Sequence, residues 1–357
     1  MIVARCLAAL MLSTLNGPTD PDADSTQNAL VSIVSAPVAG RPAWDIPIEY
    51  NRAVDRWLSY YQRRGRRNIQ IHLARGGRYE QALRAILREH GLPQDLVYLS
   101  MIESGYDPNA YSSAHAVGLW QFLASTARRY GLRVSYWIDE RRDPVLATHA
   151  AAAYLKDLYE EFGSWYLAAA AYNGGARRVQ RAIRRTGSRD FWTIARRRYL
   201  PTETREYVPK LIAAALIAKQ PDRYGLTVAA APPLSYDLGQ VPDATSLDVI
   251  AEAAGVDVAE VKALNPQLIR GVTPPGERYY VRLPPRSGDR FVANYARIQA
   301  QARAGSIQHT VKSGDTLSRL AMAYGSDLTA IRSANPSVRP ERLQVGQQLY
   351  IPVRQEP

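Results

Sequence analysis

Three short stretches decide the fold and the chemistry of this 357-residue chain: Glu103-Ser104, Gly118-Leu119-Trp120-Gln121-Phe122 and Ala171-Tyr172-Asn173-Gly174-Gly175. The first supplies one carboxylic acid at the predicted end of a helix. The second contains a glycine that permits a close approach of the backbone, and the third an aromatic–amide pair that can line the same groove. No metal-ligand spacing, phosphate-binding loop or nucleophile elbow in the sequence competes with them. The combination favours acid–base chemistry on a glycosidic bond.

Glu103 is expected near the end of a helix that begins at Pro93-Gln94-Asp95. Proline is tolerated in the first turn of a helix, and an acid is favourable at its positive end. The stretch Ser104-Gly105-Tyr106-Asp107-Pro108 ends the helix, because glycine terminates helices and the residue before a proline avoids the helical region. One face of this helix is predicted to be core, because its apolar residues recur at helical spacing: Leu96, Leu99 and Ile102.

The position of Glu103 predicts a raised pKa for its carboxyl group. The C-terminal end of a helix carries partial negative charge, and a partly buried site disfavours ionisation of a carboxylate. A carboxyl group that stays protonated near neutral pH is what a general acid requires. The alternative interpretation is a solvated glutamate at a helix end.

These stretches resemble, in order, the signature motifs of the lytic transglycosylases, whose catalytic domain has the goose-type-lysozyme fold. The first two motifs run from Glu103 to Phe122, the third is the Ala-Tyr-Asn-Gly-Gly run, and the fourth is Pro201 to Lys210. The resemblance extends from about residue 92 to about residue 220. It implies a mainly α, lysozyme-like catalytic domain that cleaves the bond between N-acetylmuramic acid and N-acetylglucosamine in peptidoglycan without hydrolysis.

The resemblance implies a mechanism with a single carboxylate. Glu103 protonates the leaving oxygen, the substrate's acetamido group stabilises the cationic sugar, and Glu103 then takes the proton of the C6 hydroxyl as that group attacks C1. The product carries a 1,6-anhydromuramoyl end. Ordinary glycosidases need a second carboxylate, for which the candidates are Asp107, Asp139, Glu140, Asp143 and Glu203.

The local sequence explains most of these candidates without catalysis. Asp107 precedes a proline and is interpreted as a turn-forming residue. Asp139, Glu140 and Asp143 flank the pair Arg141-Arg142, which indicates a solvated, self-paired surface.

By position, the resemblance also implies seven substrate-binding residues: Ser112, Gln121, Leu123, Tyr172, Asn173, Glu203 and Tyr207. Ser112 and Gln121 fall where the family has polar groups near the sugar and the catalytic carboxyl. Leu123 falls at an apolar groove position that is often methionine. Tyr172 and Asn173 would bind the sugar and orient the reacting centre.

The last two of these residues come from the fourth motif. Glu203 would bond to the substrate or to the surroundings of Glu103, and Tyr207 starts the closing helix. The motif residues also have purely structural interpretations. Core packing explains Tyr207 equally well, and turns explain Gly118 and Gly174-Gly175.

The net charge of +12 predicts attraction to polyanions. Only five of the 45 basic residues are lysines, and so strong an arginine bias is typical of genomic base composition. Because no recognition motif accompanies the arginine runs, no nucleic-acid partner is predicted. The expected partners are peptidoglycan glycan strands and the anionic surface of the cell envelope, and the expected state is a monomer.

Cysteine and histidine usage predicts neither a disulfide nor a metal or other cofactor. Cys6 is the only cysteine, and the five histidines form no i,i+4 pair. Residues 1–15 resemble a weak secretion signal, so we expect the protein in the periplasm or cell envelope, with membrane association left open. No run of about 18 apolar residues that could span a bilayer is present.

An internal repeat lies in the C-terminal third. Leu247, Ile250-Ala251, Gly255 and Asn265-Pro266 recur 70 positions later as Leu317, Leu320-Ala321, Gly325 and Asn335-Pro336. The second copy opens with Val311-Lys312-Ser313-Gly314-Asp315-Thr316-Leu317, which resembles the start of a glycan-binding LysM module with strand–helix–helix–strand order. The first copy lacks the Gly-Asp-Thr opening and is interpreted as a degenerate LysM-like module, or as a small packing domain without ligand.

These observations predict a mainly α lysozyme-like catalytic domain followed by small α+β (βααβ) LysM modules. The expected segments are a weak signal-like segment (1–20), a disordered lead-in (21–44), a helical N-terminal extension (45–91), the catalytic domain (92–225), a linker (226–240), the degenerate LysM-like module (241–286), a second linker (287–306) and the LysM module (307–354).

Three hypotheses for function remain, and the first is favoured: a lytic transglycosylase of the envelope. The second is a goose-type lysozyme-like hydrolase, in which Asp107 or Asp139 would have to activate water. The third is a catalytically inactive peptidoglycan-binding scaffold, which the presence of Glu103 and of all four motifs argues against.

Overall fold

The computed structural model describes residues 44–135, 137–242, 245–274, 277–304 and 306–352. The predicted segments 1–20 and 21–44 lie outside the described residues, apart from Trp44.

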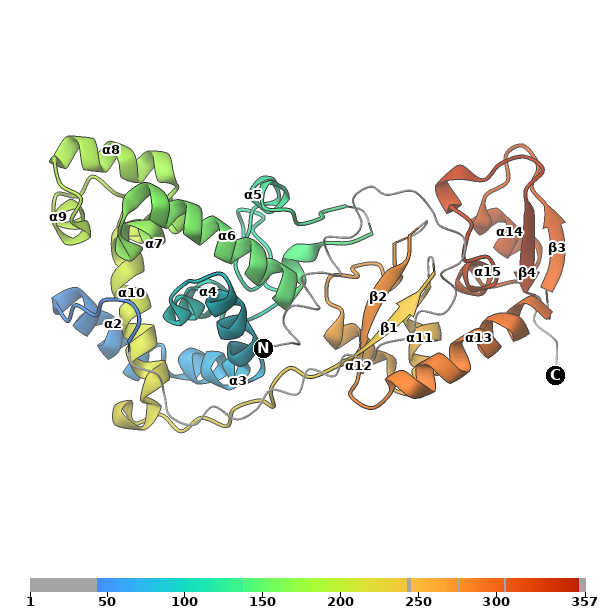
Figure 1. The fold of residues 1–357 in the computed structure, drawn as a ribbon, viewed down its shortest axis with the longest axis horizontal. Coiled ribbons are helices and arrows are strands. Elements are labelled where there is room, and N and C mark those ends of the chain that lie inside the picture. The colour runs from blue at the N-terminus through green and yellow to red at the C-terminus, as the bar shows by residue number, and fades with distance from the viewer. Residues whose placement is uncertain (1–43, 136, 243–244, 275–276, 305, 353–357) are drawn as a thin grey trace. The chain divides into compact units, whose positions relative to one another are not determined.

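The first part of the described chain is an all-helical domain with one core (Figure 1). Its elements are α2 (Arg52–Gln62), α3 (Arg66–Glu89), the 3-10 turn η1 (Gln94–Leu96), α4 (Val97–Ser104), α5 (Ala124–Arg129), η2 (Glu140–Arg142), α6 (Pro144–Phe162), α7 (Trp165–Gly174), α8 (Ala176–Thr186), α9 (Phe191–Arg196), α10 (Thr202–Lys219) and η3 (Pro221–Tyr224). Helix α4 packs against both α3 and α10, so it lies at the centre of this core.

Helix α4 forms as its local signals predict. Asp45 accepts hydrogen bonds from the free backbone N–H groups of Gln94 and Asp95, which caps the start of the helix. Every residue from 97 to 102 is buried. The helix ends at Gly105, whose φ of +62° is accessible to glycine at low cost. This geometry places Glu103 in the last turn, as predicted.

Two helices, α2 and α3, precede α4 in the segment expected to be a helical extension. Their apolar face is buried at Val54, Leu58 and Tyr61 in α2 and continues along α3. Helix α2 packs on α10. Gly77 in α3 allows the chain that follows α10 to lie against this helix, because a Cβ there would be 2.7 Å from the carbonyl oxygen of Ala231.

The two predicted repeats each fold as a strand–helix–helix–strand unit with its own core. The first consists of β1 (Asp237–Val241), α11 (Leu247–Ala254), α12 (Val258–Leu264) and β2 (Tyr279–Leu283). The second consists of β3 (Ser306–Thr310), α14 (Leu317–Ala323), α15 (Leu328–Ala334), the 3-10 turn η4 (Pro340–Arg342) and β4 (Gln348–Pro352). In each unit the two strands pair antiparallel, with Gly239 opposite Val281 and Gln308 opposite Tyr350.

The repeated asparagines connect the second helix of each unit to its last strand. The side chain of Asn265 exchanges two hydrogen bonds with the backbone of Arg282 in β2. Asn335 makes the same pair of bonds to Tyr350 in β4. The sequence indicates only that the following proline stops the helix, so this second role of the asparagine is a finding of the structure.

Two expected linkers contain regular structure. The segment 287–306 holds helix α13 (Gly288–Ala304), which adds Phe291 and Tyr295 to the core of the first unit. The segment 226–240 already contains most of β1. The i,i+4 spacing of the two aromatic residues is the signal that predicts a helix with a buried face at 288–304.

Candidate active site

Glu103 is half-buried, and its carboxylate is held by Tyr207 of α10. The tyrosine hydroxyl donates to Oε1 of Glu103 across 2.5 Å. Burial raises the pKa of Glu103 to about 7; the bond from Tyr207 and the charge of Lys210 act in the opposite direction, and the charge of Glu203 adds to the increase. The carboxyl group therefore titrates at the pH where a general acid needs to hold a proton.

The loop 118–122 is attached to α4 beside Glu103. The hydroxyls of Ser100 and Ser104 donate to the carbonyl oxygen of Leu119 across 3.2 and 2.9 Å. Gly118 is required here, since a Cβ at this position would lie 1.8 Å from the carbonyl oxygen of Arg141. The predicted close approach of the backbone is thus confirmed, and it is made to the loop that precedes α6.

Tyr172 and Tyr207 are both close enough to Glu103 for its charge to raise their pKa well above the usual tyrosine value, with burial as the larger cause. The Tyr172 hydroxyl donates to the carbonyl oxygen of Trp120 across 2.7 Å, which joins α7 to the loop 118–122. Its ring packs edge-on against Phe122 and at a tilt against Tyr154. Tyr172 therefore forms a wall of the site rather than a free surface side chain.

Asn173 and Glu203 bind one another next to this wall. The Asn173 amide donates to Oε1 of Glu203 across 3.0 Å and accepts from the hydroxyl of Thr204 across 2.9 Å. Gly174 makes this contact of α7 with α10 possible, because a Cβ there would be 2.7 Å from the Thr204 hydroxyl. Glu203 itself is exposed.

The structure thus brings four of the seven predicted substrate-binding residues to the Glu103 side of the domain: Tyr172, Asn173, Glu203 and Tyr207. The other three lie in the loop from 112 to 123. Ser112 accepts from the backbone N–H of Ala116, and Gln121 donates to the carbonyl oxygens of Gly118 and Ala110, so the side-chain hydrogen bonds described for them stay within residues 110–121. Leu123 is 46% exposed at the start of α5, as suits an apolar wall of an open groove. Their contact with a substrate stays a prediction.

Asp107 has the turn role that its sequence context predicts. Its carboxylate accepts from the backbone N–H of Asn109 and pairs with Arg75 across 3.3 Å. Its own N–H donates to the hydroxyl of Ser104.

The interpretation of Asp139, Glu140 and Asp143 as a solvated surface is wrong, since all three are buried. Asp139 forms a two-bond ion pair with Arg141, as the self-pairing suggested. Glu140 pairs instead with Arg133 across 2.7 Å. Asp143 caps α6 and pairs with Arg282, also buried, across 2.6 Å. The loop that holds these acids is the one against which Gly118 packs, through the backbone of Arg141.

Lys210 is a member of the site that sequence reasoning did not single out. Its amine donates to the carbonyl oxygen of Ile102, the residue before Glu103, across 3.0 Å. Burial lowers the pKa of this lysine, while the charges of Glu103 and Glu203 act to raise it. The available signal was its place at the end of the fourth motif, one helical turn after Tyr207.

Comparison with known proteins gives the class of each part. Residues 81–195 match the family model of the transglycosylase SLT domain, residues 237–300 that of the lytic transglycosylase MltD, LysM-like domain, and residues 309–352 that of the LysM domain. The chain therefore joins a helical domain that matches the SLT family model to two modules that match LysM-type models. The second match includes most of α13, in agreement with its place in the core of the first module.

Among its relatives, the chain is 33% identical over 282 residues to membrane-bound lytic murein transglycosylase D of Escherichia coli strain K12, over 74% of this chain and 61% of that protein. It is 30% identical to peptidoglycan transglycosylase gp16 of Escherichia phage T7, over 45% of this chain and 13% of the phage protein. The solved structure of an inactive mutant of lytic transglycosylase Slt from Pseudomonas aeruginosa is 26% identical over 42% of this chain and 24% of its own, with a TM-score of 0.35. The chain spans less than two thirds of the length of these relatives.

Proposed function

We propose that this protein is a peptidoglycan lytic transglycosylase, which cleaves the β-1,4 bond between N-acetylmuramic acid and N-acetylglucosamine and leaves a 1,6-anhydromuramoyl end. One observation carries the proposal: Glu103 is a half-buried acid with a pKa of about 7, oriented by a tyrosine, on a helix within the residues that match the SLT family model. The relatives' names refer to the same chemistry.

The reaction needs one proton donor that later becomes the acceptor. Protonated Glu103 gives its proton to the glycosidic oxygen as the bond to C1 breaks, and the neighbouring acetamido group stabilises the positive charge on the sugar. The C6 hydroxyl then attacks C1, and its proton passes to the Glu103 carboxylate. Because nucleophile and electrophile belong to the same sugar, the attack has a high effective molarity and water must only be kept out.

The surrounding residues support these steps. Tyr207 fixes the carboxyl group of Glu103 and becomes its hydrogen-bond donor each time the group ionises. Tyr172 closes the site on the α7 side, while exposed Glu203 offers one oxygen to the substrate and binds Asn173 with the other. We expect these residues, with Gln121, Ser112 and Leu123, to contact the glycan.

Hydrolysis of the goose-type-lysozyme kind is the second candidate, and it requires a second carboxylate aimed at water. Asp107 is engaged in a turn and with Arg75, and Asp139 is buried in its ion pair with Arg141. Neither of the two acids that the hydrolase hypothesis names is available as a base, so we favour the intramolecular attack. An inactive scaffold is disfavoured by the raised pKa of Glu103, which a binding surface does not need.

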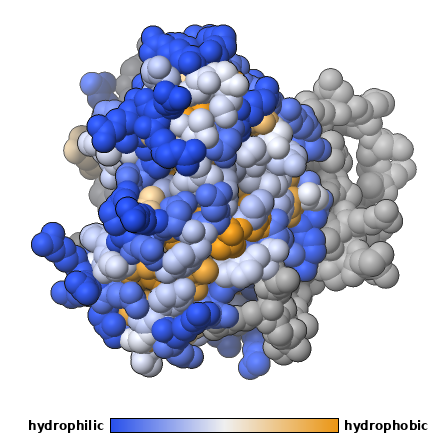
Figure 2. Space-filling view, turned by 90° about the vertical axis from the view of Figure 1, so that its left-hand side faces the viewer, coloured by the Kyte–Doolittle hydropathy of each residue, from blue (hydrophilic) through white to orange (hydrophobic). Residues whose placement is uncertain are grey.

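We further propose that the protein acts at the cell envelope, with the LysM modules bound to glycan strands. Among the described residues, no helix has both the length and the apolarity to cross a bilayer. Helix α8 offers a different attachment: its five arginines are exposed and it contains no acid. The top of the face in Figure 2, where α8 lies, is mainly hydrophilic. Such a face attracts anionic headgroups.

The test is mass spectrometry of the muropeptides that the purified protein releases from intact peptidoglycan. We expect products about 18 mass units lighter than lysozyme products and resistant to borohydride, because no water is consumed. Glu103→Gln should release nothing while it keeps its fold and its binding to the wall. Reducing ends would establish hydrolysis instead. Retained cleavage by the variant would remove Glu103 from its role.

A further inference from the structure

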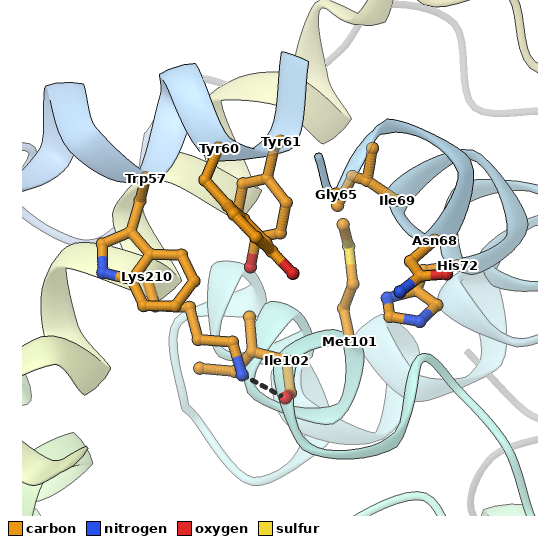
Figure 3. Close-up of a pocket in the computed structure, with 10 residues that line it drawn as sticks. All are labelled: Trp57, Tyr60, Tyr61, Gly65, Asn68, Ile69, His72, Met101, Ile102 and Lys210. Carbon is orange, nitrogen blue, oxygen red and sulfur yellow. Dashed lines mark hydrogen bonds between the residues drawn. The ribbon is translucent and has the colours of Figure 1, made fainter. Parts of the chain in front are cut away.

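A pocket of about 180 Å³ opens between α2, α3, α4 and α10 (Figure 3). Trp57, Tyr60 and Tyr61 of α2 provide aromatic walls, and Asn68, His72 and Lys210 provide polar groups. Most of this lining comes from the helical extension, which precedes the start of the SLT family match at residue 81.

The pocket is adjacent to the catalytic carboxyl group. Ile102 lines it and is the residue directly before Glu103. Lys210 lies one turn after Tyr207 on α10, and its charge acts on Glu103. A group of the substrate that enters this pocket therefore belongs to a sugar unit close to the scissile bond.

The lining is positive and rich in hydrogen-bond donors. None of the residues that line the pocket is acidic, and Lys210 is its one cationic side chain. In Figure 3 the lysine amine lies below Trp57, beside the carbonyl oxygen of Ile102 that accepts one of its hydrogen bonds. That bond uses one of the three N–H donors of the Lys210 amine. Burial holds the pKa of neighbouring His72 down at about 4, so its imidazole is neutral.

The pocket walls are fixed before any ligand binds. Gly65 lets the ring of Tyr60 lie over it, because a Cβ at that position would be 2.5 Å from the ring. The Trp57 indole donates to Glu206 across 2.9 Å. His72 packs on Gly105, the residue that ends α4. Preformed walls lose little conformational freedom on binding, which favours affinity.

We propose that this pocket binds a carboxylate carried by the muramoyl unit of the glycan, with Lys210 as its counter-ion and the aromatic rings against the attached methyl or methine groups. Its volume suits a group of a few heavy atoms, since sites that enclose a whole small molecule measure roughly 300–1,000 Å³. The carboxylate has two possible sources, the lactyl group of an unsubstituted muramoyl unit or the peptide stem attached to it. The inference rests on the proposed substrate class.

Trp57 allows a site-specific binding test. The full chain with Glu103→Gln, which prevents turnover, is labelled with 5-fluorotryptophan, and the Trp57 resonance is assigned by Trp57→Phe. Binding at the LysM modules then leaves this resonance unaffected. Three probes are titrated: chitotetraose without any carboxylate, a tetrasaccharide of alternating N-acetylglucosamine and N-acetylmuramic acid, and the same tetrasaccharide with dipeptide stems.

We expect a saturable shift of the Trp57 resonance with a carboxylate-bearing probe. The Kd for that probe should rise at least about tenfold in Lys210→Met, because the variant loses one charge-assisted hydrogen bond. Chitotetraose should shift Trp57 more weakly and equally in both proteins. A response to the unsubstituted muramoyl tetrasaccharide identifies the lactyl group as the source, and a response only to the dipeptide form identifies the stem.

Two further variants keep the test independent of Lys210's bond to α4. Asn68→Phe at the rim should obstruct the pocket and weaken the same probes, whereas Lys156→Met removes an exposed lysine of α6 and should change nothing. Equal effects of Lys210→Met on all three probes, or no Trp57 shift with either carboxylate probe, would overturn the proposal. Absence of anhydro products from the active protein would overturn the proposed reaction. The carboxylate preference is tested independently of that result, because it is measured on the inactive Glu103→Gln protein.

Discussion

The pKa of Glu103 is set by two opposing influences that come from different parts of the chain. Burial within the helical domain favours the protonated carboxyl group, while Tyr207 and Lys210, both on α10, favour the carboxylate. The balance leaves a group that can donate a proton in one step and accept one in the next. A more buried acid would keep its proton, and a solvated one would already have lost it.

Tyr207→Phe tests this balance through the pH dependence of the activity. The variant loses the hydrogen bond that stabilises ionised Glu103, so the pKa of Glu103 should rise above about 7. Because the protonated form starts the reaction, the alkaline limb of kcat/KM should move to higher pH. The maximum should fall by about 10- to 100-fold, since the carboxyl group is no longer oriented.

The measurement is the pH profile of muropeptide release between pH 5 and 9, chosen as roughly two units either side of the expected limb. Tyr130→Phe is the matched control, because its hydroxyl donates to Asp157 on the surface and not to Glu103. It should keep the wild-type profile. An alkaline limb that stays in place or moves to lower pH in Tyr207→Phe would contradict the assigned role of the tyrosine.

At the scale of elements, the helix that carries Glu103 could be predicted because its signals are local. A proline at its start, a glycine after its end and apolar residues at helical spacing lie within 13 positions, 93–105. The sequence likewise predicts that the backbone at Gly118 lies close to another segment, but it does not predict that this segment contains Arg141. The motif shows that a side chain is excluded without showing what occupies the space.

The ion pairs of the loop before α6 could not be predicted for a related reason. Glu140 and Asp143 pair with Arg133 and Arg282, of which one lies seven residues away and the other 139. In a chain with forty arginines, sequence proximity offers every acid a nearby partner. Which pair forms is decided by burial, and burial of these acids depends on the packing of the whole loop.

Helix α8 supports a prediction at this scale. Its buried residues, Val179 and Ala182, face the domain, so the arginines form the opposite face. Replacing Arg177, Arg181 and Arg184 by glutamine should weaken binding to vesicles of phosphatidylglycerol and phosphatidylethanolamine by about 3 kcal/mol, at about 1 kcal/mol for each charge near the surface. Co-sedimentation at increasing salt measures the loss, which should shrink as salt screens the charges.

The matched control removes the same charge elsewhere. Arg63, Arg64 and Arg67 are exposed around the turn between α2 and α3. The triple glutamine variant at these positions should bind the vesicles nearly as wild type does. If both variants lose the same affinity, the attraction depends on net charge alone and α8 is not a membrane-binding face.

At the scale of the whole molecule, the chain combines a helical domain that has one core with modules that have cores of their own. The second LysM module buries a separate set of apolar residues, including Ile331, Leu349 and Ile351. It can therefore contribute affinity without altering the geometry around Glu103. Two linked sites on one polymer raise the local concentration of substrate at the catalytic domain, without any new catalytic contact.

Removal of residues 305–357 should therefore separate wall binding from chemistry. We expect binding to intact peptidoglycan to weaken by about 100-fold, within the range for loss of a tethered site. Turnover of a soluble tetrasaccharide with peptide stems should stay within about twofold of the full chain, because a short glycan cannot bridge both sites. Pull-down with insoluble peptidoglycan and mass spectrometry of the soluble products measure the two quantities on one preparation. The thermal transition of the helical domain provides the folding control.

Equal wall binding by the shortened chain would mean that the second module does not hold the enzyme on its substrate. An equal loss on both substrates would mean that the second module supports the catalytic domain directly.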